Sequence, residues 1–254
     1  MPPPVPPPPD RGSACESSVG YTFPMEFSGS ASRSIGFRIF RDIERVSAEL
    51  VDAFHGKASS NVADAMGRFH FMDPGIVQRT ENPLCGVAMT VSARPGDNLM
   101  VHKALAVAGP GDVVVVTTNG NTTSAVFGDL MCRSAAAAGL GGIVVDGAIR
   151  DVDALRRIGF PTFSRTVSPG GCDKDGPGEI NVPIACGNTA VMPGDLLIGD
   201  EDGVVVVPRE DAAEVLELVR ALEAREVKRI AAIADGVLFK PEIDEALRAK
   251  GVLE

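Results

Sequence analysis

Apolar runs alternate with segments of helical periodicity through the middle of the chain, and this alternation constrains the fold more than any other feature. Three runs have the composition of buried strands: residues 85–93, 112–118 and 142–146. Three segments that follow them carry a helical pattern: residues 99–108, 126–138 and 152–158. Strands that are joined through helices pair in parallel, because the helices serve as crossover connections. The middle of the chain is therefore predicted to be an α/β domain with a parallel sheet.

The flanking segments have a different character. After Pro161, short β-like runs between Gly and Pro turns predict antiparallel or mixed pairing, at residues 162–165, 179–184, 196–198 and 204–207. Helices are expected in four outer segments: residues 42–54, residues 61–66 with Ser59 or Ser60 as N-cap, residues 210–233, and a short segment after Pro241. We therefore expect one domain over residues 35–208, with a helical extension over residues 209–254.

Residues 1–34 are rich in Pro, Ser and Gly, beginning MPPPVPPPPD. Runs of proline favour an extended and solvated chain, so a disordered tail is expected. Two alternatives remain open, a proline-rich ligand for a partner and a misassigned start codon, since Met25 is available.

Composition excludes several classes of protein. The chain has a formal net charge of −10 over 254 residues, so a basic face that binds phosphates is not expected. Nucleic acid is therefore not an expected partner. The five cysteines form no CxxC pair and their odd number disfavours a disulfide framework. No apolar run is long enough to cross a membrane, and the N-terminus lacks the profile of a signal peptide. We expect a cytoplasmic protein.

The most informative stretch is GIVVDGAIRD at residues 142–151, where a buried strand runs into charged residues. Asp146, Arg150 and Asp151 are expected together at the carboxyl end of this strand, where open α/β sheets bind ligands. A guanidinium beside a carboxylate can hold an anionic substrate and a hydrated cation. The alternative is structural, with Asp151 capping the next helix and Arg150 on the surface.

A second candidate is the segment NGNTTSAVFGD at residues 119–129, predicted as a loop after the preceding strand. Gly128 allows the backbone to approach a ligand, and free N–H groups at a helix start favour an anion. Asp129 either faces the ligand or serves the helix dipole. Because both connections leave neighbouring strands, Asp129 and Arg150 are expected to converge on one mouth.

Two further residues are weaker candidates. Lys174 lies in a Gly-rich, charged segment that is typical of a solvated turn. Glu226 interrupts the apolar stripe of the long C-terminal helix, where it either flanks the stripe or enters the site of a neighbouring subunit.

Several familiar motifs are absent. The cluster Gly139–Gly142 precedes a strand, whereas a dinucleotide fingerprint follows one. No P-loop, HExxH or GxSxG motif occurs, and His55, His70 and His102 lack the spacing of metal ligands. His102 is expected to be packed or solvated.

Several segments in order resemble the RraA-like family, which includes 4-hydroxy-4-methyl-2-oxoglutarate and 4-carboxy-4-hydroxy-2-oxoadipate aldolases. The matching segments are NLMVHKA at 98–104, GDLM at 128–131, VDGAIRD at 145–151, NVPI at 181–184, PGD at 193–195 and DEDGVVVVP at 200–208. The resemblance runs from about residue 43 to the terminal helices and does not specify one substrate.

The resemblance implies a β/β/α swivelling-type α/β fold, assembled as homotrimers or homohexamers with the C-terminal helices on a neighbouring subunit. It implies that Asp151 is the protein ligand of Mg²⁺ or Mn²⁺ and that Asp129 holds a water on the metal. Arg150 would bind the pyruvyl oxygens, helped by the backbone N–H groups of Leu130 and Met131.

Two roles follow less firmly from the resemblance, because loop and helix lengths vary. Glu226 of an adjacent subunit would also hold water, and Lys174 would lie near the distal carboxylate of the substrate.

The implied activity is that of a divalent-metal-dependent, class II pyruvate aldolase. It would cleave 4-hydroxy-2-oxo diacids, with oxaloacetate decarboxylation as a side reaction. Diacids from aromatic degradation and 2-oxo acids from sugar acids are both compatible substrates. The alternative is a non-catalytic regulator, because the family also contains protein inhibitors of an RNA-degrading endonuclease. Retention of Asp129, Arg150 and Asp151 favours the enzyme.

Overall fold

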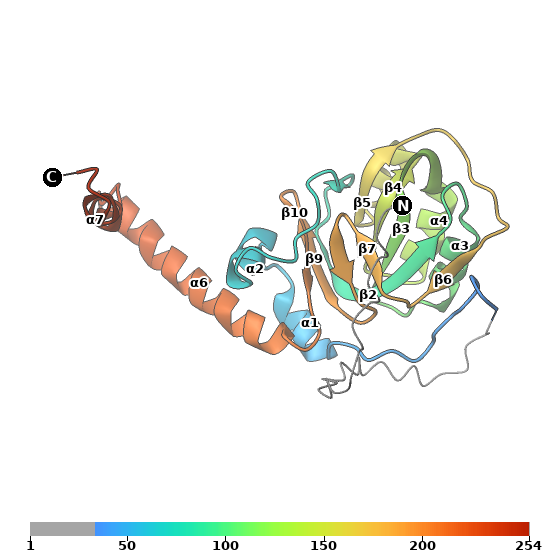
Figure 1. The fold of residues 1–254 in the computed structure, drawn as a ribbon, viewed down its shortest axis with the longest axis horizontal. Coiled ribbons are helices and arrows are strands. Elements are labelled where there is room, and N and C mark those ends of the chain that lie inside the picture. Colours follow the sequence, from blue (N-terminus) through green and yellow to red (C-terminus); the bar gives the residue numbers. More distant parts are fainter. Residues whose placement is uncertain (1–33, 254) are drawn as a thin grey trace, which may run out of the picture.

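A mixed sheet forms the centre of the computed structural model, which describes residues 34–253 (Figure 1). The tail expected over residues 1–34 therefore lies, except for Ser34, outside the described residues. The strands of this sheet are β1 (Val77–Gln78), β2 (Leu84–Ala93), β3 (Asp112–Phe127), β4 (Gly142–Ile149), β5 (Thr162–Val167), β6 (Gly178–Ile180), β9 (Leu196–Asp200) and β10 (Gly203–Val207). Their order is β1-β5-β4-β3-β2-β9-β10, with β6 paired to β2.

The pairing confirms the predicted change of character along the chain, but the change comes after β5 rather than at Pro161, since β5 pairs in parallel with β4. β2, β3, β4 and β5 pair in parallel, as strands joined through helices should. The later strands pair antiparallel: β9 with β2, β10 with β9, and β6 with β2. A separate hairpin of β7 (Ile184–Cys186) and β8 (Thr189–Val191) completes the strands.

Three layers result, because the central strands alternate apolar side chains toward both faces. The crossover helices α3 (Leu99–Val107), α4 (Asp129–Ala137) and α5 (Val152–Ile158) pack on one face, around residues such as Val114, Val145 and Phe127. The β7–β8 hairpin packs on the other face, over Val115, Val144 and Phe163. The predicted β/β/α arrangement is confirmed.

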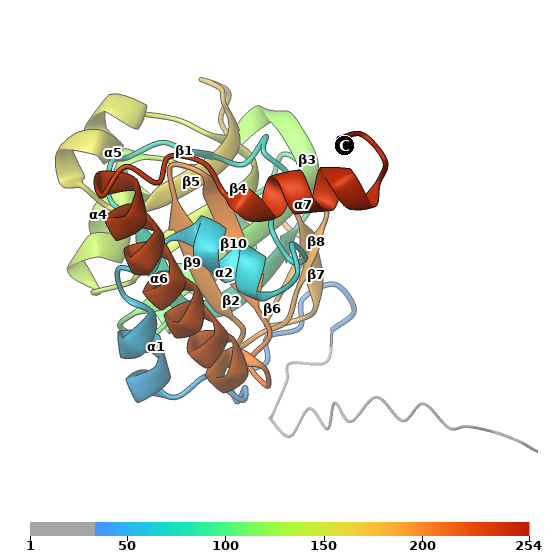
Figure 2. The same ribbon diagram turned by 90° about the vertical axis from the view of Figure 1, so that its left-hand side faces the viewer.

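A third apolar cluster joins the outer helices to the antiparallel end of the sheet. Helices α1 (Ala48–Phe54) and α2 (Ser59–Ala65) pack with the first half of α6 (Ala212–Ala234) against β9 and β10 (Figure 2). Beyond this contact α6 runs away from the body and leads to α7 (Pro241–Ala249) (Figure 1). Across residues 34–253, no helix is long and apolar enough to span a membrane.

The predicted loop over residues 119–129 is wrong. β3 continues to Phe127, and α4 begins at Asp129 rather than at residue 126. Asn119 and Gly120 have left-handed backbone, and the strand absorbs them as shifts of register against β4. The turn residues therefore bend the strand without ending it.

Two predicted helix starts are also wrong. The first helix begins at Ala48, where the Ser47 hydroxyl accepts the N–H of Leu50 at 3.3 Å. Ser59 lies inside α2 rather than at its N-cap, because its hydroxyl donates to Asp200 Oδ1 at 2.6 Å.

Candidate functional site

The ends of β3 and β4 bring two polar connections together. After β3, Gly128 is the N-cap of α4, whose first-turn N–H groups have no partner within the helix. After β4, the N–H of Arg150 donates to the carbonyl of Phe127 at 3.0 Å. This hydrogen bond fixes the two strand ends to each other, and it confirms that the two connections converge.

Asp151 is held in an unusual backbone conformation at the start of α5. Its φ of 59° and ψ of 34° place it in the left-handed region, which is uncommon for a residue with a side chain. Its carboxylate Oδ2 accepts the N–H of Asp129 at 3.1 Å and lies 3.5 Å from Nε of Arg150. Such strained residues gather at functional sites, where the surrounding contacts enforce them.

Gly128 is required by the closeness of these side chains. A Cβ atom at this position would lie 2.7 Å from Asp151 Oδ2 and 3.0 Å from Arg150 Cγ. Because the φ of Gly128 is −163°, its backbone is ordinary extended chain, and the requirement is one of space.

A cavity of about 330 Å³ opens at this point. Except for Asp146 and Glu226, it contains every site residue predicted from the sequence: Gly128, Asp129, Leu130, Met131, Arg150, Asp151 and Lys174. The structure thus brings together residues that lie as much as 46 positions apart (174 − 128). Their individual roles stay predictions.

The same cavity has lining residues that sequence reasoning missed. Asn98 precedes α3 and His102 lies within it, four positions later, so both face the cavity. Burial and the charge of Lys174 lower the pKa of His102. Asn98 Nδ2 donates to the carbonyl of Val126 at 3.2 Å, whereas its buried Oδ1 has no partner within residues 34–253. The i, i+4 spacing, on a helix that follows the carboxyl end of β2, was the signal that could have found them.

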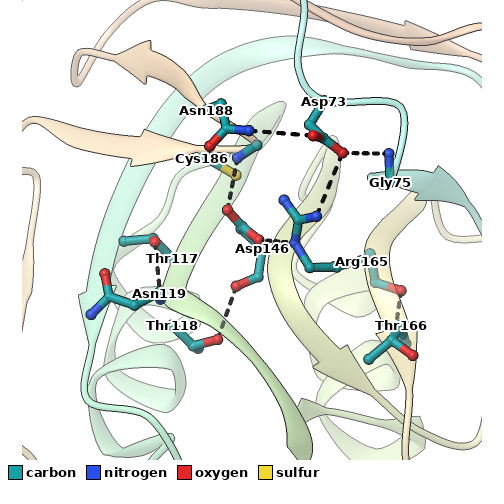
Figure 3. Close-up of polar contacts among 12 residues, drawn as sticks. Asp73, Gly75, Thr117, Thr118, Asn119, Asp146, Arg165, Thr166, Cys186 and Asn188 are labelled. Carbon is teal, nitrogen blue, oxygen red and sulfur yellow. Dashed lines mark hydrogen bonds and ion pairs between the residues drawn. The ribbon is translucent and has the colours of Figure 1, made fainter.

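Asp146 does not belong to this site, so the prediction that placed it there is wrong. β4 runs on to Ile149, and Asp146 lies within the strand, facing the β7–β8 hairpin (Figure 3). Its carboxylate accepts Nε–H of Arg165 and, at 2.8 Å, the N–H of Gly187. Nη1 of Arg165 in turn lies 3.5 Å from Oδ1 of Asp73, so this is a partly buried supporting network.

Glu226 is not brought to the cavity of its own chain. It lies on α6, where its carboxylate accepts Nδ2–H of Asn61 on α2 at 2.9 Å. Its action in a neighbouring subunit stays a prediction.

The donor set fits a hydrated hard cation. No group of three or more His, Cys, Asp or Glu that could hold a metal occurs among residues 34–253, which disfavours a fully protein-coordinated ion. Mg²⁺ keeps several waters and needs one or two carboxylates. The Asp151 carboxylate is half-exposed at the cavity. Asp129 lies beside it, and its Oδ1 accepts Nε–H of Arg133 at 2.8 Å.

The fold and this cavity define an α/β protein whose site combines a guanidinium, a carboxylate and a helix N-terminus at strand ends. The family model for RraA-like proteins, described as Aldolase/RraA, matches residues 48–206. The chain is 38% identical over 191 residues to a protein of Halalkalibacterium halodurans with the provisional name 4-hydroxy-4-methyl-2-oxoglutarate aldolase, covering 75% of this chain and 91% of that one. The chain belongs to the RraA-like family.

Solved structures agree with this assignment. An uncharacterised protein from Pseudomonas syringae pv. tomato has a TM-score of 0.70 at 29% identity, over 77% of this chain and 92% of its own. RraAS2 of Streptomyces coelicolor, titled an unusual member of the RNase ES inhibitor RraA family, has a TM-score of 0.65 at 27% identity, over 75% and 100%.

Proposed function

We propose that the protein is a pyruvate-forming carbon–carbon lyase that depends on Mg²⁺ or Mn²⁺. It cleaves 4-hydroxy-2-oxo diacids to pyruvate and a second oxo acid, and it decarboxylates oxaloacetate as a side reaction. The observation that carries this proposal is the joint placement of Arg150, Asp151 and the α4 N-terminus at one cavity. The names of relatives such as the Thermus thermophilus 4-hydroxy-4-methyl-2-oxoglutarate aldolase, 36% identical over 112 residues, support it.

Different residues of the chain bind different groups of the substrate. The first-turn N–H groups of α4 at Leu130 and Met131 bind the C1 carboxylate, since a helix N-terminus favours an anion. Arg150 donates to the C2 oxygen. Lys174, which lines the same cavity, pairs with the distal carboxylate of a diacid.

Cleavage needs a proton acceptor near the C4 hydroxyl and stabilisation of the negative charge that develops on the C2 oxygen. The proton of the C4 hydroxyl passes through a held water to the Asp129 carboxylate, and the C3–C4 electron pair passes toward C2 as the C4 carbonyl forms. The fixed positive charge of Arg150 stabilises the negative C2 oxygen of the pyruvate enolate. Protonation at C3 by water then gives pyruvate.

A divalent cation bound to Asp151 would supply further Lewis-acid stabilisation of that oxygen. Loss of CO₂ from oxaloacetate leaves the same enolate, which is why the decarboxylation is expected as a side reaction.

The test is pyruvate release from oxaloacetate and from 4-hydroxy-4-methyl-2-oxoglutarate, measured with Mg²⁺ and with EDTA. Arg150→Met and Asp151→Asn should each lower kcat by about 100-fold or more, because each removes stabilisation of the developing charge. Arg156→Met and Asp153→Asn are matched controls, because they break an exposed pair 3.4 Å apart on the same helix. They should leave turnover unchanged.

A second function, inhibition of an RNA-processing enzyme through protein contacts, is favoured by one likeness. The structure titled the RNA-processing inhibitor RraA from Thermus thermophilis has a TM-score of 0.56 at 28% identity. Background pyruvate release that is indifferent to EDTA, Arg150→Met and Asp151→Asn would favour this regulator over the lyase.

A further inference from the structure

The segment that carries Lys174 is attached to the start of α3 by one buried carboxylate, that of Asp97. This segment, residues 171–177, joins β5 to β6 and has no helix or strand of its own. Lys174 is exposed within it, so its position depends on what fixes the backbone on either side.

Asp97 accepts hydrogen bonds from both parts of the structure. Its Oδ2 accepts the N–H of Asp175 at 2.7 Å and of Gly176 at 2.8 Å, directly after Lys174. Its Oδ1 accepts the N–H of Leu99 at 2.9 Å, in the first turn of α3. Only 1% of Asp97 is exposed, so these bonds are sheltered from water.

The backbone on the other side of Lys174 is fixed to the same place. Asp173 donates its N–H to the carbonyl of Gly96 at 2.8 Å, and its carbonyl accepts the N–H of Asn98 at 3.0 Å. Lys174 is therefore the single residue between two attachments to residues 96–99. The same few residues also position Asn98 and His102, which line the cavity together with Lys174.

A role confined to capping α3 does not account for these contacts. The Leu99 bond alone would serve the helix, yet two of the three backbone N–H donors to Asp97 belong to the Lys174 segment. Burial would raise the pKa of Asp97, but these three donors and Arg94 lower it below its usual value, so the carboxylate is charged at neutral pH.

We propose that Asp97 is a positioning residue that holds Lys174 at the cavity and thereby gives the site its preference for 2-oxo acids with a distal carboxylate. The inference rests on the proposed function, in which Lys174 meets that carboxylate. Asp97 itself touches no substrate.

Binding rather than turnover is the test, because it separates this inference from the lyase proposal. Calorimetry in Mg²⁺-containing buffer compares 2-oxoglutarate with 2-oxopentanoate, which has the same chain length and no distal carboxylate. The wild-type protein should bind the diacid more tightly, and Lys174→Met should remove the preference. Asp97→Asn should reduce the preference about tenfold, the scale of one hydrogen bond to a charged group, while 2-oxopentanoate binds as before.

Asp173→Asn is the matched control. It removes an exposed carboxylate from the same segment and leaves the donors to Asp97 in place, so the preference should persist. In the double variant Asp97→Asn/Lys174→Met, the loss should equal that of Lys174→Met alone, since both changes act through one contact.

Asp97→Glu provides a second variant in case Asp97→Asn does not fold. It keeps the charge but displaces the carboxylate, and it should reduce the preference in the same way. The inference is overturned if the wild type shows no diacid preference, or if folded Asp97→Asn or Asp97→Glu retains it in full. A protein that releases no pyruvate yet shows the predicted binding pattern would refute the lyase and leave the positioning role intact.

Discussion

At the scale of single residues, the geometry of the candidate site depends on available space as much as on charge. Asp151 reaches the N–H of Asp129 only because its backbone is left-handed and Gly128 has no side chain between them. Even a single added Cβ atom at Gly128 would push apart the guanidinium, the carboxylate and the helix N-terminus.

Gly128→Ala is therefore expected to lower pyruvate release by about tenfold to 100-fold, because displacement of catalytic groups by about 1 Å has effects of that size. The free energy of unfolding should fall by about 1–3 kcal/mol from overpacking. Steady-state kinetics and urea unfolding measure the two effects.

Gly109→Ala is the control, because its Cβ would meet nothing closer than Asp112 Oδ2 at 3.7 Å. Wild-type turnover in Gly128→Ala would show that the close approach of Asp151 is not needed.

The sequence identified most residues of the site, for a definite reason. Arg150 and Asp151 follow an apolar run directly, and the carboxyl ends of parallel strands share one edge of the sheet. Asn98 and His102 were missed because their i, i+4 spacing places them on one face of α3 but does not tell whether that face meets solvent or a cavity. Asp146 was misplaced because nothing in GIVVDGAI marks where the strand ends.

At the scale of elements, the long β3 shows where local signals fail. Asn119 and Gly120 favour a turn, but pairing with β4 is resumed at Asn121, Ala125 and Phe127. Tertiary pairing overrides local turn preference here, and periodicity alone does not reveal it. Helices α3, α5 and α6 were predicted to within a few residues. For α6 the signal was an apolar stripe of helical period.

The turn between β8 and β9 contains a titrating group. Asp195 is buried and accepts the N–H groups of Met192 at 2.8 Å and Arg209 at 3.2 Å, so it joins the start of β9 to the segment before α6. Burial raises its pKa from 3.8 to about 6. Because the folded state binds this proton more tightly than the unfolded state, the contribution to stability is complete below pH 3.8 and is lost as pH rises through about 6.

Asp195→Asn should remove this loss. The free energy of unfolding of Asp195→Asn minus that of wild type should rise by on the order of 2–3 kcal/mol from pH 4 to pH 7. Altered hydrogen bonds in the variant shift this difference equally at every pH and do not change the rise. Urea unfolding over this range measures the change. Asp202→Asn, on the exposed β9–β10 turn, is the control and should show the same pH dependence of stability as wild type. If Asp195→Asn also shows the wild-type pH dependence, Asp195 is not the group responsible for the loss of stability.

At the scale of the whole molecule, α6 and α7 extend away from the body (Figure 1). The buried residues of α6 end at Val219, and large apolar side chains beyond it are exposed: Val227, Ile230, Ile233, Val237, Leu238, Phe239 and Ile243. Arg229 holds the segment between α6 and α7 by donating to the carbonyls of Val237 and Leu238, at 2.9 and 2.8 Å. Exposed apolar patches of this kind mark interaction surfaces.

We expect a homotrimer or homohexamer in which this apolar surface is covered by another subunit. Ile230→Asp combined with Phe239→Asp should shift the sedimenting species toward monomer, because it places two charges in the covered face. Ile35→Asp, at a position 97% exposed on the N-terminal segment, is the control. A wild-type protein that sediments as a monomer at micromolar concentration would exclude this arrangement.

One strand, β4, serves two purposes that do not interfere. Its interior position Asp146 supports the hairpin layer, while Arg150 and Asp151 lie just past its tip. Support of the hairpin layer and lining of the cavity thus fall to separate positions within ten consecutive residues. A substitution at Arg150 or Asp151 can therefore change what the cavity binds without removing a contact of the scaffold.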